Sequence, residues 1–282
     1  MHCVLSLTLA LTAQPAETAT PAPCPPAQVQ VSAVDALLDA IEKSDAAVMS
    51  ISADILYDRV FEIQGDRQIR TGKLYVADRR TPGSPVPARV IGARFESLQV
   101  GERFTPEIYH VIFDGAYLVE RWPGQKQFVK TQLVRAGEVA DALRVGKNPL
   151  PLPIGQKKAD LLARYIAETP AAKEGAVGNV EAETPKIAAF IAGTRQLKLT
   201  VRPELVSTEE LHEIRVWYKP EGDLLLPRLV RAVNRAGDVS LIQLINVRAN
   251  QPIPDEGLDM TSPTDGWNVQ VRELPPPSTG TP

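Results

Sequence analysis

The first periodic segment of the chain predicts a short amphipathic helix. Apolar residues recur at intervals of three and four over residues 33–43, which places them on one side of a helix. These residues are Val34, Leu37, Leu38 and Ile41. Ser32 stands before the segment, where its hydroxyl can accept a hydrogen bond from a free N–H of the first turn. We therefore expect a helix with one face to bury.

From Ile51 onward the period changes to two, which is typical of strands. Apolar and polar residues alternate over residues 51–63, and shorter segments of strand-forming residues follow. They span residues 72–76, 88–98, 109–113, 116–120, 127–130, 197–201, 213–218, 226–234, 239–247 and 267–272. The Asp114-Gly115 dipeptide lies between two apolar runs and indicates a hairpin, because both turn positions need a positive φ. Sequential strands usually pair, so the pattern predicts an antiparallel sheet.

The middle of the chain interrupts this series of strands. Residues 138–146 and 156–167 have helical spacing, and a polar linker over residues 168–183 follows. Between the two helices, leucine and isoleucine alternate with proline over residues 149–154. Proline has no N–H to donate, so this segment is excluded from the interior of a sheet.

These elements together predict an α+β fold. About ten strands with a right-handed twist cannot stay flat, so the sheet curls into a partial or closed barrel. The space inside such a sheet is too wide for its own side chains to fill, so helices or a ligand must occupy it. We expect a large curved antiparallel sheet, an unclosed β-barrel, with helices covering its concave face.

The two ends of the chain differ from this domain. Residues 1–19 are typical of an export signal, because an apolar core is followed by small residues and proline, although a basic leader is missing. The competing interpretation is an unstructured cytosolic tail. We expect export to the periplasm, a Pro-rich tether over residues 20–31, a single domain over residues 32–274 and a disordered tail over residues 275–282.

Composition removes several classes of function. Lys and Arg total 31 against 34 Asp and Glu, and no basic run is present, so a nucleic-acid partner is not expected. The two cysteines, Cys3 and Cys24, precede the first helix, which argues against a structural disulfide and a cysteine-based metal site. Ala22-Pro23 before Cys24 lack the Leu-small-small pattern of a lipid attachment site, so we disfavour a lipid anchor.

The sequence also offers little for catalysis. Its three histidines, His2, His110 and His212, lie far apart, and no HExxH, CxxC, GxSxG or Gly-rich phosphate motif is present. Carboxylates are common, but they fall at turns and strand edges, where solvation explains them. A pair of acids brought together only by the fold stays open as an alternative. We expect neither enzyme activity nor a metal or cofactor.

Two features could serve a ligand. The first is Leu150, Leu152 and Ile154 among the prolines, which form either a core-packing loop or an apolar lid over the hollow of the sheet. The second is Arg79 and Arg80, followed by Arg89 and Arg94. These arginines are either ordinary solvated charges, or one of them reaches into the hollow and donates to carbonyl groups of a covering helix.

Several stretches of the chain follow one another in a recognisable order and spacing. A helix stands directly before the first strand. The stretches after it are Gly72-Lys73-Leu74-Tyr75-Val76, Phe113-Asp114-Gly115-Ala116-Tyr117-Leu118, Pro123-Gly124-Gln125-Lys126-Gln127, Leu226-Pro227-Arg228-Leu229, residues 246–254 and residues 262–269. In these features, which cover residues 33–273, the chain resembles the LolA-like family of periplasmic outer-membrane lipoprotein carriers.

The resemblance implies an unclosed barrel whose apolar cavity shields acyl chains across an aqueous compartment. It also implies an arginine at a strand end that contacts the lid, for which Arg79 or Arg80 is the nearest match. We expect the cavity and lid to be lined by apolar side chains of the strands and the central segment. The candidates are Ile91, Phe95, Phe113, Leu118, Leu143, Leu150, Leu152, Ile154, Leu161 and Leu162.

Three hypotheses follow for the function. The leading one is a periplasmic binding protein, a monomer, that ferries lipids or acylated lipoproteins between membrane-bound donor and acceptor proteins. The alternative is an envelope sensor domain that detects lipids or lipoproteins and acts through a protein partner. The third is a hydrolase that uses carboxylates inside the barrel. Lipid extraction separates the first from the third, and capture of one stoichiometric membrane protein favours the second.

Overall fold

We analysed a computed structural model that describes residues 32–79, 89–135, 150–176, 184–264 and 266–275. These residues lie within one compact unit, Ser32–Pro282. Among them, no helix has the length and the hydrophobicity that a membrane-spanning segment needs. The predicted helix at 138–146 lies outside the described residues.

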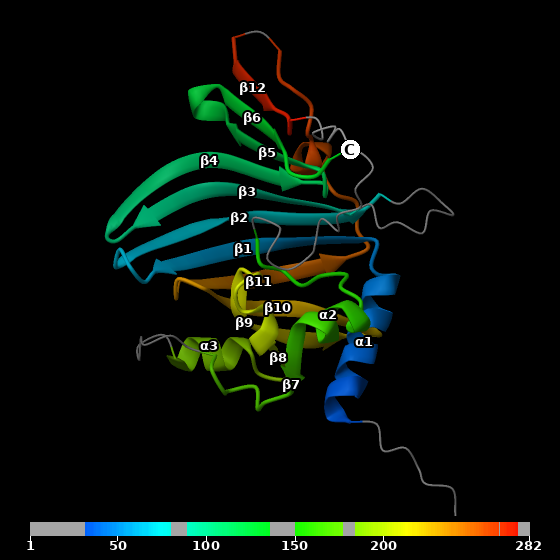
Figure 1. The fold of residues 1–282 in the computed structure, drawn as a ribbon. Helices are drawn as coiled ribbons and strands as arrows, with labels where there is room; N and C mark the ends of the chain where they lie inside the picture. The colour runs from blue at the N-terminus through cyan, green and yellow to red at the C-terminus, as the bar shows by residue number, and fades with distance from the viewer. Residues whose placement is uncertain (1–31, 80–88, 136–149, 177–183, 265, 276–282) are drawn as a thin grey trace, which may run out of the picture. The chain divides into compact units, whose positions relative to one another are not determined.

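Twelve strands of the described residues form one sheet, in the order β12-β6-β5-β4-β3-β2-β1-β11-β10-β9-β8-β7 (Figure 1). Their bounds are β1 Ser50–Phe61, β2 Asp66–Asp78, β3 Arg89–Val100, β4 Arg103–Phe113, β5 Tyr117–Trp122, β6 Gln127–Gln132, β7 Tyr165–Glu168, β8 Arg195–Val201, β9 Leu211–Glu221, β10 Leu224–Asn234, β11 Val239–Ala249 and β12 Asn268–Arg272. The predicted fold class, a large curved sheet that does not close, is confirmed.

Most neighbouring strands are consecutive along the chain and antiparallel, as predicted, and two pairings join strands that are not consecutive. β1 pairs with β11 in antiparallel register, which joins the first and last thirds of the chain. β12 pairs with β6 in parallel register, from Asn268↔Gln127 to Arg272↔Thr131. The expectation of a purely antiparallel sheet is therefore wrong at this edge, because the chain returns to β6 after a long excursion rather than through a hairpin.

The concave face of the sheet carries the main apolar cluster. The alternate residues Ile51, Ala53, Ile55 and Tyr57 of β1 point to this side. Helix α1 (Ala33–Ala47) packs Leu37, Leu38 and Ile41 into the same cluster, and helix α2 (Lys158–Arg164) adds Leu161. The hydroxyl of Ser32 accepts a hydrogen bond from the N–H of Asp35 at 3.0 Å, so Ser32 caps α1 as predicted.

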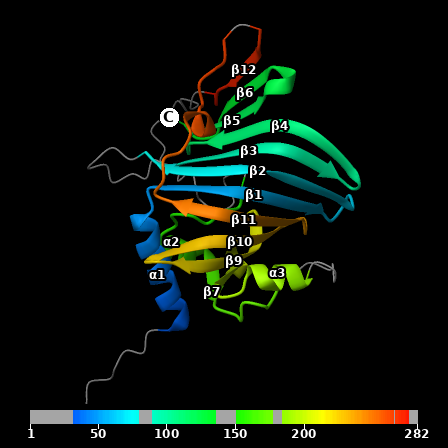
Figure 2. The same cartoon turned by 180° about the vertical axis from the view of Figure 1, so that it is seen from behind.

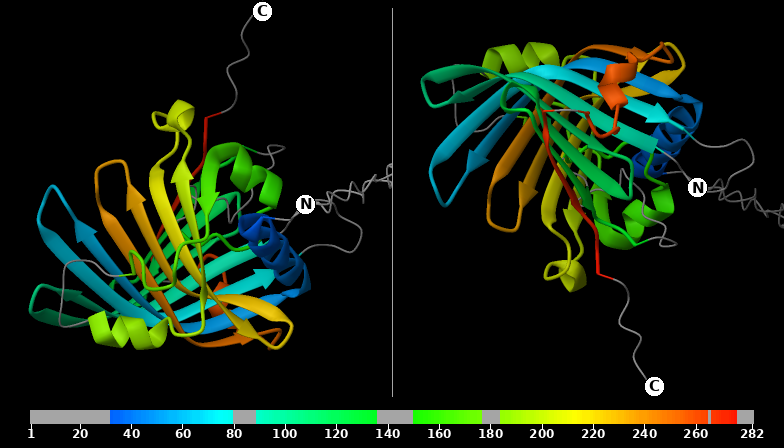
Figure 3. Two further views of the ribbon diagram at one scale, coloured as in Figure 1. Left: turned by 90° about the horizontal axis from the view of Figure 1, so that it is seen from below. Right: turned by 90° about the horizontal axis from the view of Figure 1, so that it is seen from above.

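The convex face carries two further coverings. The first is the segment around η4 (Asp255–Leu258), seen from behind in Figure 2, which packs Leu258 on Ile112 and Val119. In the second, helix α3 (Thr184–Phe190) and the turn at residues 171–176 lie over Trp217 and Leu229. The apolar residues next to Trp217 and Leu229 in sequence belong to the concave cluster, so these two side chains point to the convex side. Figure 3 shows α3 on the opposite side of the sheet from α2.

The structure corrects two expectations about the helices. The predicted helix at 156–167 ends at Arg164, because Tyr165–Glu168 forms strand β7 against β8. Helix α3, which lies beyond the predicted polar linker, was not predicted at all. It holds Ile187 at the convex face, where Ile191 follows just after its end. The two short 3-10 turns η1 (Pro123–Gln125) and η3 (Pro203–Leu205) connect strands.

The sheet is split between β10 and β11. These strands pair only from Leu229↔Gln243 to Val233↔Val239, although both continue well beyond Leu229 and Gln243. Pro227 lies in the unpaired part of β10 and has no N–H to offer β11. On β11, Asn246 has φ 53° at the position where the register against β1 shifts.

The split leaves backbone N–H and carbonyl groups of β10 without a partner on β11, and helix α1 forms hydrogen bonds with two of them. Leu225 faces Pro220 of β9, and the Ser44 hydroxyl takes up its two backbone groups. The N–H of Leu225 donates to the Ser44 Oγ at 2.8 Å, and that hydroxyl donates to the Leu225 carbonyl at 3.2 Å. Because Ser44 is 3% exposed, its bonds replace those that a neighbouring strand would make in a dry environment.

His110 predicts a pH dependence of stability. It lies on the convex side of β4, where burial, with Arg121 and Arg94 nearby, lowers its pKa from 6.5 to about 4, against the opposing effect of Glu256 and Asp259. The unfolded chain therefore binds one more proton than the folded chain between these pH values. We expect the free energy of unfolding to fall by up to about 3 kcal/mol as the pH drops from 6.5 to 4.

Urea unfolding at pH 7 and at pH 4.5 checks this expectation. The His110→Asn variant removes the titrating group and should lose less stability than the unmodified chain over the same interval. Equal losses in both proteins would show that the acid sensitivity comes from the carboxylates instead.

Candidate functional site

Most of the predicted cavity residues lie together on the concave face. Ile91, Phe95 and Phe113 are buried in the apolar cluster, and so are four residues of the central segment and α2. Those four are Leu150, Leu152, Ile154 and Leu161. Leu118 and Leu162 are partly buried and pack against the same cluster. Leu143 and Arg80 lie outside the described residues, and Arg79 is exposed.

Residues 150–155, which we call the Pro-rich segment, cover part of the concave face. Leu150, Leu152 and Ile154 are 2%, 0% and 3% exposed. Pro151 and Pro153 have no N–H, and the N–H of Leu152 donates to the Leu150 carbonyl at 2.7 Å, within the segment itself. The segment is therefore held against the sheet mainly by buried side chains, and this attachment is one that another apolar group can replace.

One end of the Pro-rich segment is fastened to α1 and β3 at the Arg89–Asp45–Gly155 junction. The N–H of Gly155 donates to the Asp45 carboxylate at 2.8 Å, and the Arg89 guanidinium donates to the Asp45 carbonyl at 3.0 Å. Gly155 has φ +75°, and a Cβ at this position would lie 1.2 Å from Nη1 of Arg89. Arg89 therefore makes the contact with a covering helix that was predicted for Arg79 or Arg80, and it is 8% exposed.

The other end of the Pro-rich segment borders a hollow with an aromatic floor. Tyr57, Phe95, Tyr109 and Trp122 come from β1, β3, β4 and β5, and neighbouring ring centroids lie 6.2, 6.0 and 4.9 Å apart. Leu150 lines this hollow together with the first three of these rings and Val111. The hollow has a volume of about 220 Å³. Aromatic rings in such a row offer a flat apolar surface to a chain lying across them.

Two arginines stand at the edge of the aromatic floor. The Arg70 guanidinium lies 5.1 Å from the Tyr109 ring centroid and forms an ion pair with Glu107 at 2.7 Å. Arg59 lies 4.6 Å from the Phe61 ring centroid and, among the described residues, has no acidic partner. Its Nε is buried and makes no hydrogen bond within the described part of the chain.

The floor itself is uncharged. Burial, together with the hydrogen bond to Glu120, raises the pKa of Tyr109 far above its ordinary value. Its phenol therefore stays protonated and donates to Oε1 of Glu120 at 2.7 Å. The site thus combines an apolar floor with an edge that carries Arg59 and the Arg70–Glu107 ion pair. In the described ranges no three His, Cys, Asp or Glu side chains gather as metal ligands would.

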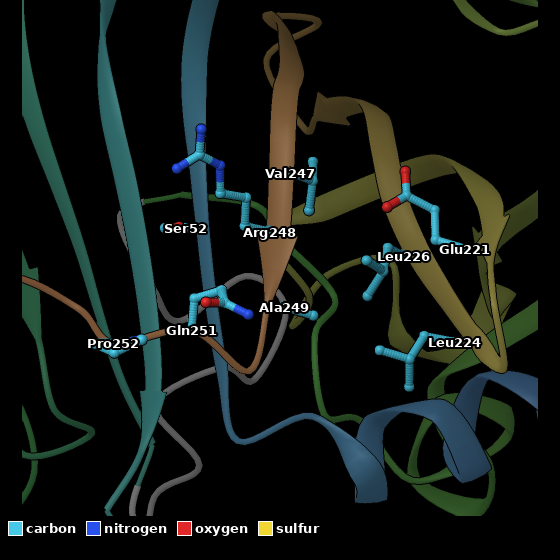
Figure 4. A pocket seen from close by; sticks show the side chains of 9 residues that line it. All are labelled: Ser52, Glu221, Leu224, Leu226, Val247, Arg248, Ala249, Gln251 and Pro252. Atoms are coloured by element: carbon cyan, nitrogen blue, oxygen red, sulfur yellow. The ribbon is translucent and has the colours of Figure 1, made fainter.

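A second hollow opens through the split in the sheet (Figure 4). It has a volume of about 660 Å³, with Leu224 and Leu226 on β10 facing Val247 and Ala249 on β11. Leu226 and Val247 belong to the concave cluster, so this opening reaches the same apolar interior from the side. The Arg228 guanidinium lies 3.5 Å from the Leu244 carbonyl and so bridges the two strands.

Sequence reasoning missed Arg59 and Arg70 as site residues, whereas Arg89 was one of the four arginines considered for a contact with a covering helix. Arg59 and Arg70 occupy alternate positions that share a face with Tyr57 and Leu74, and a count of alternation could have flagged them. Only the pairing Tyr57↔Arg70 shows that the two strands bring these charges to one place. The Arg89 contact depends on the end of α1, which lies far away in sequence.

No protein-family model and no curated protein matches the sequence. Similar solved structures include an uncharacterized conserved protein from Thermus thermophilus, with 11% identity, a TM-score of 0.42 and coverage of 86% of this chain and 100% of that chain. A LolA superfamily protein from Nitrosomonas europaea has 9% identity, a TM-score of 0.34 and coverage of 80% and 97%. The complex of MucA and MucB from Pseudomonas aeruginosa has 12% identity, a TM-score of 0.37 and coverage of 79% and 59%. These scores are too low to carry an argument about function.

Proposed function

We propose that this chain is a periplasmic carrier that shields acyl chains of lipids or lipoproteins on the concave face of its sheet. One observation carries the proposal: the Pro-rich segment buries three large apolar side chains there and takes few backbone hydrogen bonds from the sheet. An acyl chain offers the sheet the same kind of surface. It can therefore take the place of Leu150, Leu152 and Ile154 at little net cost.

The small size of the hollow beside Leu150 supports this exchange. Pockets for drug-sized ligands are usually 300 to 1,000 Å³, roughly, and the hollow beside Leu150 has about 220 Å³. It admits the end of a chain while the Pro-rich segment is closed. Each further methylene that enters after the segment moves contributes about 0.8 kcal/mol, so binding is strong and still reversible.

In this role the chain acts as a monomer that receives its cargo from one membrane-bound protein and delivers it to another. Export across the inner membrane through residues 1–19 belongs to the same proposal. Leu150, Leu152 and Ile154 form the lid that the acyl chain displaces, and the other predicted cavity residues are its ligand contacts. Arg89 lies at the fixed end of the lid, and Arg79 and Arg80 are further candidates. No catalytic step is part of the proposal.

The alternative, a sensor that acts through a protein partner, is favoured by the outer edge strand β12. Val269 and Val271 of this strand are 39% and 54% exposed. Among the described residues, β12 pairs with β6 on one side and has no partner on the other, so it ends the sheet order. An edge strand with exposed valines is suited to pairing with a strand of another protein.

Mass spectrometry of lipid extracts tests the carrier function. We expect the full chain, purified from its own cell envelope, to carry a near-stoichiometric amphiphile that displaces an apolar fluorescent probe from the refolded protein. If no amphiphile co-purifies and none displaces the probe, the carrier function is wrong. Recovery of one stoichiometric membrane protein with an empty chain would instead support the sensor.

A further inference from the structure

The hollow beside Leu150 has a polarity that the carrier function does not require. A cavity for acyl chains alone needs apolar walls, whereas the lining of this one includes Arg59, Gln68 and Arg70. The apolar part of the lining is Tyr57, Phe95, Val111 and Leu150, and the Arg59 and Arg70 guanidiniums lie 5.9 Å from the Tyr57 and Phe95 ring centroids. The lining therefore offers both apolar surface and positive charge, which an amphiphile with a charged headgroup requires.

We propose that this hollow recognises an amphiphile with an anionic headgroup, and this inference rests on the proposed function. The acyl chain lies along the aromatic floor under Leu150, and a phosphate or carboxylate lies between Arg59 and Arg70. Both guanidiniums are planar groups with several donors, which suits the oxygens of either anion.

The environment of Arg59 favours an anion over a neutral headgroup. Arg59 has no acidic partner among the described residues and keeps its Nε buried without an acceptor. A buried donor without a partner costs free energy, and an anionic oxygen supplies the missing acceptor. The contacts of Arg59 with the Tyr57 and Phe61 rings, at 5.9 and 4.6 Å, hold the guanidinium at the edge of the hollow.

Glu107 competes with a bound anion for Arg70. The two side chains form an ion pair at 2.7 Å, in which Arg70 is 22% exposed and Glu107 is 24% exposed. A bound anion must share Arg70 with this carboxylate or displace it. Glu107 therefore weakens the binding of an anionic headgroup, and its removal should strengthen that binding.

Two ligands with twelve-carbon acyl or alkyl chains and different headgroups separate the effect of the headgroup on affinity from the effect of the apolar chain. We expect dodecyl phosphate to bind the full chain about tenfold tighter than glycerol monolaurate, because a hydrogen-bonded charge adds roughly that factor. Both are measured by displacement of an apolar fluorescent probe below their micelle concentrations. The difference should shrink as the ionic strength rises, since both arginines remain partly exposed.

Variants of the same chain test the assignment. Arg59→Gln should remove the preference for dodecyl phosphate, and Glu107→Gln should increase it severalfold, while Arg195→Gln, at an exposed position on β8, leaves it unchanged. Thermal unfolding of each variant shows whether it is folded. Because Glu107→Gln predicts a gain, the proposal stays testable if Arg59→Gln fails to fold.

Four results would overturn the inference. Equal affinities for the two dodecyl ligands would remove the headgroup preference and leave the carrier function standing. Inorganic phosphate binding as tightly as dodecyl phosphate would identify a phosphate site instead of an amphiphile site. A preference for dodecyl phosphate that persists unchanged in both Arg59→Gln and Glu107→Gln would place the headgroup elsewhere. Failure of every dodecyl ligand to bind would count against the carrier function as well.

Discussion

Replacing Leu152 with alanine should raise the affinity for an apolar fluorescent probe by at least about tenfold. Leu152 is 0% exposed at the centre of the Pro-rich segment, and truncation of a fully buried leucine usually costs about 2 to 5 kcal/mol. If the segment opens separately from the rest of the domain, the truncation destabilises the closed state of the segment and leaves its open state unchanged. The fraction of open molecules then rises, and with it the apparent affinity.

Leu199→Ala provides the matched control. Leu199 lies on β8, belongs to the same apolar cluster and is also 0% exposed. We expect this variant to lose a comparable amount of stability in urea unfolding, without a gain in probe affinity. If Leu152→Ala behaves in the same way as Leu199→Ala, the Pro-rich segment is part of the permanent core, and the lid is wrong.

Gly155→Ala should release the fixed end of the Pro-rich segment. Alanine at φ +75° is strained, and its Cβ would occupy the place of the Arg89 guanidinium. Arg89 must then leave a site where it is 8% exposed and bonded to the Asp45 carbonyl. We expect a loss of at least about 2 kcal/mol beyond the backbone strain, because a buried charge loses its partners.

Gly193→Ala isolates the backbone strain. Gly193 has φ +74°, almost the same conformation, and apart from its chain neighbours no described residue has an atom within 4 Å of the position of its Cβ. Urea unfolding should show a loss of about 1 to 2 kcal/mol for this variant, and a clearly larger one for Gly155→Ala. Equal losses would mean that Arg89 moves away freely and does not fasten the segment.

The sequence predicts well which side chains lie on the concave face, because the alternation of apolar and polar residues along each strand is a local pattern. Ile51, Ala53 and Ile55 alternate with Ser52 and Asp54, and that period alone shows which side chains share a face. Ser32 marks the start of α1 in the same local way. Leu150, Leu152 and Ile154 were singled out because prolines separate them, and all three are buried against that face.

The end of α2 shows where local patterns fail. Leu161, Leu162 and Tyr165 fit a helix, yet the backbone of Tyr165 joins β8 opposite Val201, and the phenol ring becomes 0% exposed. The free edge of β8 decides this conformation, and no local propensity reports it. The short helix α3 was missed for a related reason, since its apolar residues pack against Trp217, which lies on a later strand and is not visible in the local pattern.

The candidate site could be predicted only in part because it depends on register across strands. Arg59 and Arg70 look like solvated strand charges until the pairing of β1 with β2 places them over the rings of β1, β3 and β4. The split between β10 and β11 likewise appears only in their pairing, which stops at Leu229↔Gln243. Neither arrangement follows from spacing along one strand.

The pairing of β1 with β11 has a consequence for how the chain folds. Asp54 and Asn246, which are hydrogen-bonded across these strands at 2.7 Å, are 192 residues apart in the sequence. During synthesis, β1 to β6 can form through local hairpins, while the edge of β1 that later pairs with β11 stays unpaired until β11 has been made. We expect the closure of this pair to be the slow step of refolding, because its contact order is high. Until then β1 is the edge at which incomplete chains would aggregate.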